Sequence, residues 1–98
     1  MLEPADTRPR FSFRVSRALS TAVVTLHGDV DQPGVEELAT TLRYLIEDQR
    51  NQTVIVDMRD VSGVDPSAMT LFQEAIKWTR RRGVKFRLHD PPSAAAAS

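Results

Sequence analysis

The chain has 98 residues, a hydrophobic share of 41% and 13 basic against 13 acidic side chains, so its formal net charge is +0. A chain of this length forms one domain at most, and the lack of a global positive field argues against direct binding of nucleic acid. The sequence contains no cysteine, which excludes disulfides and fits a reducing, cytoplasmic location. No apolar run approaches the roughly 20 residues of a membrane span, so we expect no membrane insertion.

The first half of the chain contains two strand patterns and one helix pattern. Residues 1–10 hold two prolines and four charges and indicate a loose lead-in. Apolar residues alternate over 11–16, and residues 21–28 have high β propensity and end at Gly28. We therefore predict two strands joined by a short hairpin loop. The next apolar residues recur at helical spacing and predict a helix with one apolar face: Val35, Leu38, Leu42, Leu45 and Ile46.

The second half continues with strand, helix and strand. Residues 53–58 are β-branched and almost continuously apolar, which is typical of a strand buried on both faces of a parallel sheet. A second helix follows and is predicted to end at Gly83, with a core face of Ala68, Met69, Phe72, Ala75, Ile76 and Thr79. Residues 84–90 are the last predicted strand. The order ββαβαβ predicts an α/β domain, a small mixed sheet with helices packed against it, over residues 11–92, followed by an Ala-rich tail at 93–98.

The start of the second helix carries the clearest candidate site, Asp65-Pro66-Ser67. Asp65 is a favourable N-cap and Pro66 suits the first helical position, so capping alone explains this stretch. A serine in the first turn is also exposed at the positive end of the helix dipole, where a phosphate gains free N–H donors. Ser67 is therefore a suitable phosphoacceptor. It is a poor catalytic nucleophile, because no sequence element near it supplies an activating base.

From about residue 11 to residue 92 the sequence resembles the STAS domain, the fold of anti-sigma factor antagonists. The resemblance lies in the stretches "VVTLHGDVD", "VIVDMRDVSGVDPSAM" and "RRGVKFRLHD". Gly28 and Asp31 match the family's Gly-x-x-Asp turn, and Asp57-Met58 matches its Asp-Leu-type strand end.

The family's Asp-Ser-Ser/Thr-Gly-Leu motif falls on the start of the second helix. Asp65 matches its aspartate and Ser67 its phosphorylatable serine, whereas Pro66, Ala68 and Met69 depart from the pattern. Ala68 adds a methyl group where a partner or kinase loop needs close backbone approach. The chain also stops soon after the last strand, where family members usually continue with more helix and strand.

The resemblance implies a regulatory binding protein that is not an enzyme and has no cofactor. In such antagonists the unmodified form binds an anti-sigma factor, in many cases a serine kinase. Phosphorylation of the serine, here Ser67, weakens that binding, and a phosphatase restores it. The residues expected to contact the partner on this register are Asp31, Asp65, Pro66, Ser67, Ala68 and Met69.

Leu71 and Trp78 fall on the flank of the second predicted helix, off the centre of its core face. Either they pack beneath a loop or the tail, or they form a contact surface, since tryptophan is enriched in interface hot spots. We expect the contact surface, which adds Leu71 and Trp78 to the partner-binding residues. An exposed apolar ridge of this kind would also allow the protein to associate with itself as a homodimer.

Two other functions remain as alternatives. The first is a scaffold or adaptor subunit of a larger assembly, such as a stressosome-like particle or a lipid-transport ATPase. The second is a nucleotide or small-molecule sensor that uses Gly28–Asp31 and Asp65–Ser67 as a phosphate-binding edge. His27 and His89 lack the spacing of a metal motif, so no metal site is expected. The Arg80–Arg82 run is most simply a set of dipole partners at a helix C-terminus.

Overall fold

A computed structural model describes residues 10–49 and 51–90, so the predictions for the lead-in and the tail fall largely outside the described part of the chain. The elements follow the predicted order, with a short π-helical turn, η1, added after α1. They are β1 (Ser12–Ala18), β2 (Thr21–Val30), α1 (Gln32–Arg43), η1 (Tyr44–Asp48), β3 (Thr53–Val64), α2 (Pro66–Arg82) and β4 (Lys85–His89). The predicted mixed α/β architecture is thereby confirmed.

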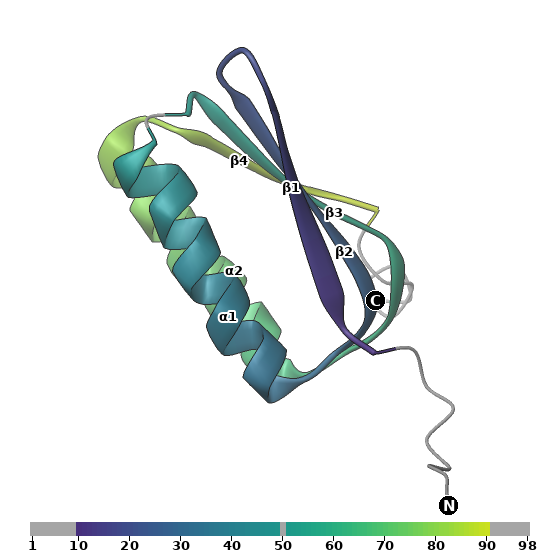
Figure 1. The fold of residues 1–98 in the computed structure, drawn as a ribbon. Coiled ribbons are helices and arrows are strands. Elements are labelled where there is room, and N and C mark those ends of the chain that lie inside the picture. The colour runs from purple at the N-terminus through teal and green to yellow at the C-terminus, as the bar shows by residue number, and fades with distance from the viewer. Residues whose placement is uncertain (1–9, 50, 91–98) are drawn as a thin grey trace, which may run out of the picture.

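The four strands form one sheet in the order β1-β2-β3-β4. β1 and β2 are antiparallel, as the short hairpin loop predicted, and β3 lies parallel to both β2 and β4. Figure 1 shows both helices on the same face of this sheet. Neither helix in residues 10–49 and 51–90 is long and apolar enough to cross a membrane.

The core lies between the sheet and the two helices. Alternate residues of β2 and β3 point into it, and Val24, Leu26 and Val56 are fully buried. The alternation continues on β3, where Thr53 and Ile55 are only half-buried. The prediction that this strand is buried on both faces was therefore wrong. Its other face stays partly open because both helices pack on one side of the sheet.

β2 and β3 are longer than predicted. β2 runs past Gly28 to Val30, and β3 runs past Met58 to Val64, so the expected turn and loop at these places are strand instead. The two strands stay paired up to Val30 and Val64, with two shifts of register that each add one residue to β3. Such bulges bend a strand without ending it. As a result, β3 leads directly into the cap of α2.

The buried face of α2 is rotated from the predicted one. Leu71 and Trp78 are 7% and 9% exposed, whereas Met69 and Ile76, predicted to be core, are 47% and 39% exposed. α1 packs along the flank of α2 that carries Trp78, and the Arg43 guanidinium stacks over the Trp78 ring at 4.8 Å from its centroid. The prediction that Leu71 and Trp78 form an exposed contact surface was therefore wrong, because they are part of the core beneath a neighbouring helix.

Candidate functional site

Both helices begin at the same end of the molecule (Figure 1). Val30 pairs with Val64 at the ends of β2 and β3, and the Asp65 N–H donates to the Val30 carbonyl at 2.9 Å. Asp31 and Asp65 directly follow these paired residues, so the structure brings the two predicted aspartates to one edge. This edge lies beyond the carboxyl ends of the parallel strands, which is where α/β sheets commonly bind other molecules.

Asp65 caps α2 and also holds the hydroxyl of Ser67. Its Oδ2 atom accepts a hydrogen bond from the Ser67 backbone N–H at 2.8 Å and a short one from the Ser67 Oγ hydroxyl. Pro66 occupies the first helical position, so the predicted cap is confirmed. The hydroxyl bond, followed by the backbone bond, holds the pKa of the Asp65 carboxyl below its ordinary value. The carboxylate is therefore ionised at neutral pH.

This arrangement suits a serine that is phosphorylated by another enzyme better than a serine that acts as a catalytic nucleophile. A carboxylate with a lowered pKa is a weak base, so Asp65 orients the Ser67 proton without removing it. Phosphorylation of Ser67 would replace that proton and end the hydroxyl bond to Asp65. It would also place two negative groups side by side at the helix start.

The residues beside Ser67 divide into exposed and buried positions. Pro66 and Met69 are exposed, whereas Ala68 is 0% exposed. The methyl group of Ala68 therefore packs in the core and does not crowd Ser67 at the surface. The prediction that the Ala68 side chain contacts a partner was wrong, because the third position of α2 faces inward.

Met69 and Ile76 extend the exposed surface along α2. They stand two turns apart on one flank of the helix, and both are large apolar residues in contact with solvent. Their spacing was visible in the sequence, but the helical pattern alone allowed either flank of α2 to be covered. What decides the matter is the position of α1, which packs against the flank that carries Leu71 and Trp78 and leaves Met69 and Ile76 exposed.

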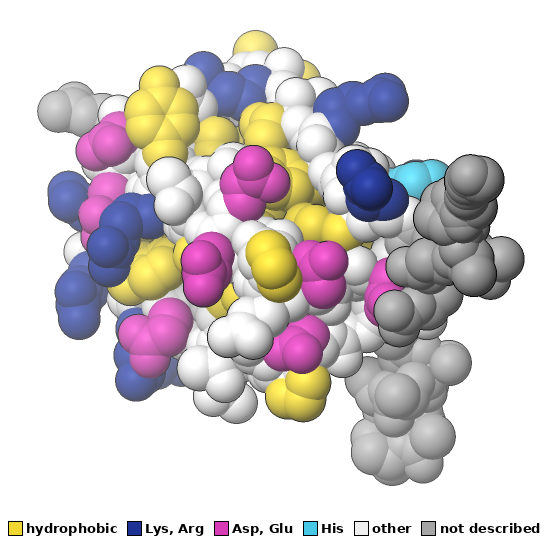
Figure 2. Space-filling model, turned by 60° about the horizontal axis from the view of Figure 1, so that its bottom comes forward, with side chains coloured by type: hydrophobic (Ala, Val, Ile, Leu, Met, Phe, Trp, Pro, Cys, Tyr) yellow, Lys and Arg dark blue, Asp and Glu magenta, His cyan; other side chains and the backbone are white. Residues whose placement is uncertain are grey.

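Acidic side chains gather on this end of the molecule. Figure 2 shows them across the middle of the face, with most Lys and Arg side chains nearer its edge. The two caps Asp31 and Asp65 contribute, and α1 adds exposed Glu36 and Glu37 in its first turns. A phosphate on Ser67 would add negative charge to a surface that is already acidic.

Asp57, which matches the strand end of the motif, has a structural role. It is 7% exposed, and its Oδ1 accepts a hydrogen bond from the Arg59 N–H at 3.1 Å, while its Oδ2 accepts one from Arg59 Nη2, also at 3.1 Å. Burial alone would raise the pKa of this carboxyl, but the bonds from Arg59 outweigh burial and lower it. Arg59 thus supplies hydrogen-bond donors to both carboxylate oxygens of Asp57, at the point where β3 first shifts its register against β2.

Each of the two histidines lies near an aspartate carboxylate. His27 Nδ1 lies 3.7 Å from Asp60 Oδ2, and His89 Nε2 lies 3.5 Å from Asp90 Oδ2. Across residues 10–49 and 51–90, no group of three or more His, Asp or Glu side chains is placed to hold a metal ion.

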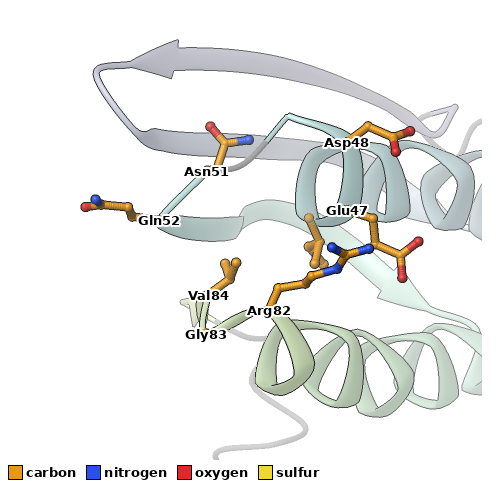
Figure 3. A pocket seen from close by; sticks show the side chains of 8 residues that line it. Glu47, Asp48, Asn51, Gln52, Arg82, Gly83 and Val84 are labelled. Atoms are coloured by element: carbon orange, nitrogen blue, oxygen red, sulfur yellow. The ribbon is translucent and has the colours of Figure 1, made fainter.

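A cavity of about 470 Å³ opens at the other end of the molecule (Figure 3). The end of α2 and the residues around η1 line it, and Figure 3 shows the side chain of Arg82 directed toward Glu47. Asn51 on its wall accepts a bond from Arg17 Nε and donates one to the Leu45 carbonyl, both at 2.9 Å. Arg82, on the wall of this cavity, lies 15 residues after Ser67 along α2, a distance of about 22 Å. It is therefore not part of the Ser67 site.

The comparisons with known proteins agree with this fold. The family model of the STAS domain matches residues 12–97. The phosphorylated Bacillus cell fate determinant SpoIIAA superimposes with a TM-score of 0.78 at 20% identity, covering 88% of this chain and 78% of that chain. The unphosphorylated anti-sigma factor antagonist SpoIIAA gives 0.77 at 20% identity, covering 88% and 80%.

A third similar structure is the STAS domain of an antisigma-factor antagonist from Rhodobacter sphaeroides. It superimposes with a TM-score of 0.64 at 17% identity, covering 81% of this chain and 85% of that chain. No curated protein matches the sequence. At these levels of identity the structural matches show the fold alone.

Proposed function

This chain belongs to the STAS domain family, and we propose that it is an anti-sigma factor antagonist whose binding to an anti-sigma factor is switched by phosphorylation of Ser67. One observation carries the proposal. The Ser67 hydroxyl lies at the second position of α2, bonded to an ionised cap carboxylate, after exposed Pro66 and two residues before exposed Met69. The structural similarity to SpoIIAA in both its phosphorylated and its unphosphorylated form supports the proposal.

The switch follows from the charge that phosphorylation adds. A phosphoserine carries about −1.5 to −2 charges at neutral pH, and a partner that covers it must desolvate or pair that charge. The Asp65 carboxylate already stands beside Ser67, so the two groups repel each other. A loss of about 3 kcal/mol in binding free energy weakens binding by more than a hundredfold.

The partner surface that we propose consists of exposed and half-buried residues around the start of α2. Asp31, Asp65, Pro66, Ser67 and Met69 lie at this end, and they keep the roles expected from the resemblance. The anti-sigma factor is in this account the serine kinase that modifies Ser67, and a phosphatase restores the binding form. The chain then acts in the cytoplasm by binding, without catalysis of its own.

Mapping the phosphorylation site tests the proposal most simply. The protein is incubated with ATP and its cognate anti-sigma kinase, and the phosphopeptides are sequenced by mass spectrometry. We expect phosphate on Ser67, none after Ser67→Ala, and undiminished labelling in the control variant Thr70→Ala. Ser62 and Thr70 are exposed nearby hydroxyls, and phosphate found chiefly on either of them would refute the assignment. An unlabelled protein that still binds its partner would favour the scaffold or adaptor role.

A further inference from the structure

The two edge strands of the sheet, β1 and β4, differ in how they are protected. An unpaired edge offers free N–H and C=O groups to another strand, and charged side chains are the usual defence. On β4, alternate residues Lys85, Arg87 and His89 share one face. Two copies of β4 aligned antiparallel about Phe86 would place Lys85 against Arg87, and alignment about Arg87 would place Arg87 against itself. Like charges directly opposite each other destabilise a pair of strands, so β4 resists pairing with its own copy.

β1 also carries two exposed charges, Arg14 and Arg17, but neither stands at the centre of the strand. The strand pairs with β2 in an unbroken register from Ser12–His27 to Ala18–Thr21, without a bulge or a proline. Every residue of β1 except Phe13 is exposed, and the apolar Val15 is 38% exposed. Within residues 10–49 and 51–90, no strand pairs with the outer edge of β1, which is therefore a regular edge with an apolar residue at its centre.

The backbone of β1 presents its free groups on alternate residues. The hairpin turns through Leu19 and Ser20, and the pair that closes a two-residue turn is a hydrogen-bonded pair. That pair is Ala18–Thr21, so every second residue counted back from Ala18 bonds to β2. The residues between them, Phe13, Val15 and Arg17, direct their N–H and C=O groups away from the sheet.

One antiparallel register matches these free groups and also the side chains. With Val15 opposite the Val15 of a second copy, all seven residues of β1 are aligned. Phe13 then faces Arg17, whose Nε already donates to Asn51 Oδ1 at 2.9 Å, and Arg14 faces Ser16, so no like charges stand opposite each other. The outward-directed residues oppose one another, so each pair can exchange both backbone bonds. Alignment about Arg14 would instead place Arg14 against its own copy.

We propose that this protein forms a homodimer through β1, with the two-fold axis at Val15. The dimer joins two four-stranded sheets into one and keeps the helices of both copies on the same face. The surface is distinct from the α2 flank that the sequence suggested for self-association. α2 follows β3, an interior strand of the sheet, so the Ser67 site stays outside the dimer interface. The inference is accordingly independent of the proposed function.

Cross-linking at single cysteines tests the register. The chain has no cysteine, so each substitution introduces a unique thiol. Val15→Cys places the two thiols at the axis, whereas Ser12→Cys places them about 20 Å apart, since each lies three residues from the axis. A short bis-maleimide should join the two copies of Val15→Cys and leave Ser12→Cys uncoupled. Equal coupling of both variants, or coupling of neither, would overturn the proposal.

The mass of the full chain in solution tests the dimer itself. Light scattering should give twice 11.0 kDa for the unmodified sequence. Val15→Lys places two cations opposite each other and should raise the dissociation constant at least about tenfold. Thr40→Lys adds the same charge at an exposed site on α1 and should leave the dimer intact. A mass of 11.0 kDa at every concentration, or a dimer that withstands Val15→Lys while circular dichroism is unchanged, would contradict the proposal.

Discussion

The two helices begin with the same device, and only one of them carries a hydroxyl. Asp31 caps α1 by accepting a hydrogen bond from the Gly34 N–H at 2.9 Å, and Asp65 caps α2 by accepting one from the Ser67 N–H at 2.8 Å. Both helices have a proline in the first turn, but the second helical position is Pro33 in α1 and Ser67 in α2. α1 shows that a cap of this kind does not require a hydroxyl at that position. The capping bond from the backbone N–H therefore does not itself require the Ser67 hydroxyl.

The two starts also differ in what covers them. At the third position of α1, the Phe11 ring packs so closely on Gly34 that a Cβ atom would collide with it. The third position of α2 is Ala68, whose methyl group is buried in the core, while Pro66 and Met69 beside it are exposed. The start of α1 is thus covered by Phe11, whereas the start of α2 is open to solvent at Pro66 and Met69. A partner can reach only the second of these without displacing an aromatic ring.

The largest effect on stability is expected when the residues at the third position of the two helices are exchanged, with glycine replaced by alanine in α1 and alanine by glycine in α2. Gly34→Ala should lower the free energy of unfolding by about 1–3 kcal/mol, because the new methyl group must displace both the Phe11 ring and the Asp31 carboxylate. Ala68→Gly should cost about 1 kcal/mol through lost helix propensity. Urea denaturation of both variants measures these changes. A stabilised Gly34→Ala protein would show that the start of α1 is not closed by Phe11.

The next effect concerns the two caps. Asp31→Ala should cost about 0.5–2 kcal/mol, the usual loss on removing a capping side chain. Asp65→Ala removes a carboxylate that accepts two bonds from Ser67 rather than one, so its unfolding midpoint should fall further than that of Asp31→Ala. The denaturant midpoints of the two variants decide the order. A smaller fall for Asp65→Ala would mean that the hydroxyl bond adds nothing to the cap.

The Asp65 cap also has a pH dependence with a definite sign. The folded protein holds the pKa of Asp65 below its ordinary value of 3.8, so the unfolded chain takes up the proton first. The stabilisation is complete well above that value and is lost as the pH falls through the lowered pKa. Thermal unfolding from about pH 6 downward should therefore show a steeper loss for the unmodified protein than for Asp65→Ala. Parallel curves would contradict the assigned pKa shift.

The smallest effect is expected from Ser67→Ala. This change removes the hydroxyl but keeps the backbone N–H bond to Asp65 and introduces a good helix former. The free energy of unfolding should stay within about 0.5 kcal/mol of the unmodified protein. A loss of several kcal/mol, measured by urea denaturation, would mean that Ser67 is a structural residue after all.

The sequence predicted the order of the elements and the cap of α2 because both depend on local signals. Asp65, Pro66 and Gly83 act on their own helix, and their roles follow from backbone geometry alone. The covered flank of α2 could not be predicted, because Leu71–Trp78 and Met69–Ile76 have the same spacing and only the position of α1 distinguishes them. The ends of β2 and β3 were also missed. Gly28 signals a strand end locally, but pairing with β3 carries β2 past it at a φ of 92°.

We propose that charge at Ser67, and not charge at any helix start, controls partner binding. Calorimetry with the cognate anti-sigma factor tests this proposal, using the unmodified protein, the protein phosphorylated at Ser67, and Pro33→Glu. Pro33→Glu adds an acid at the matching position of α1, where helix starts tolerate acids. The account predicts binding more than about a hundredfold weaker for the phosphorylated protein and nearly unchanged for Pro33→Glu. Equal affinity of the phosphorylated and unmodified proteins would contradict it.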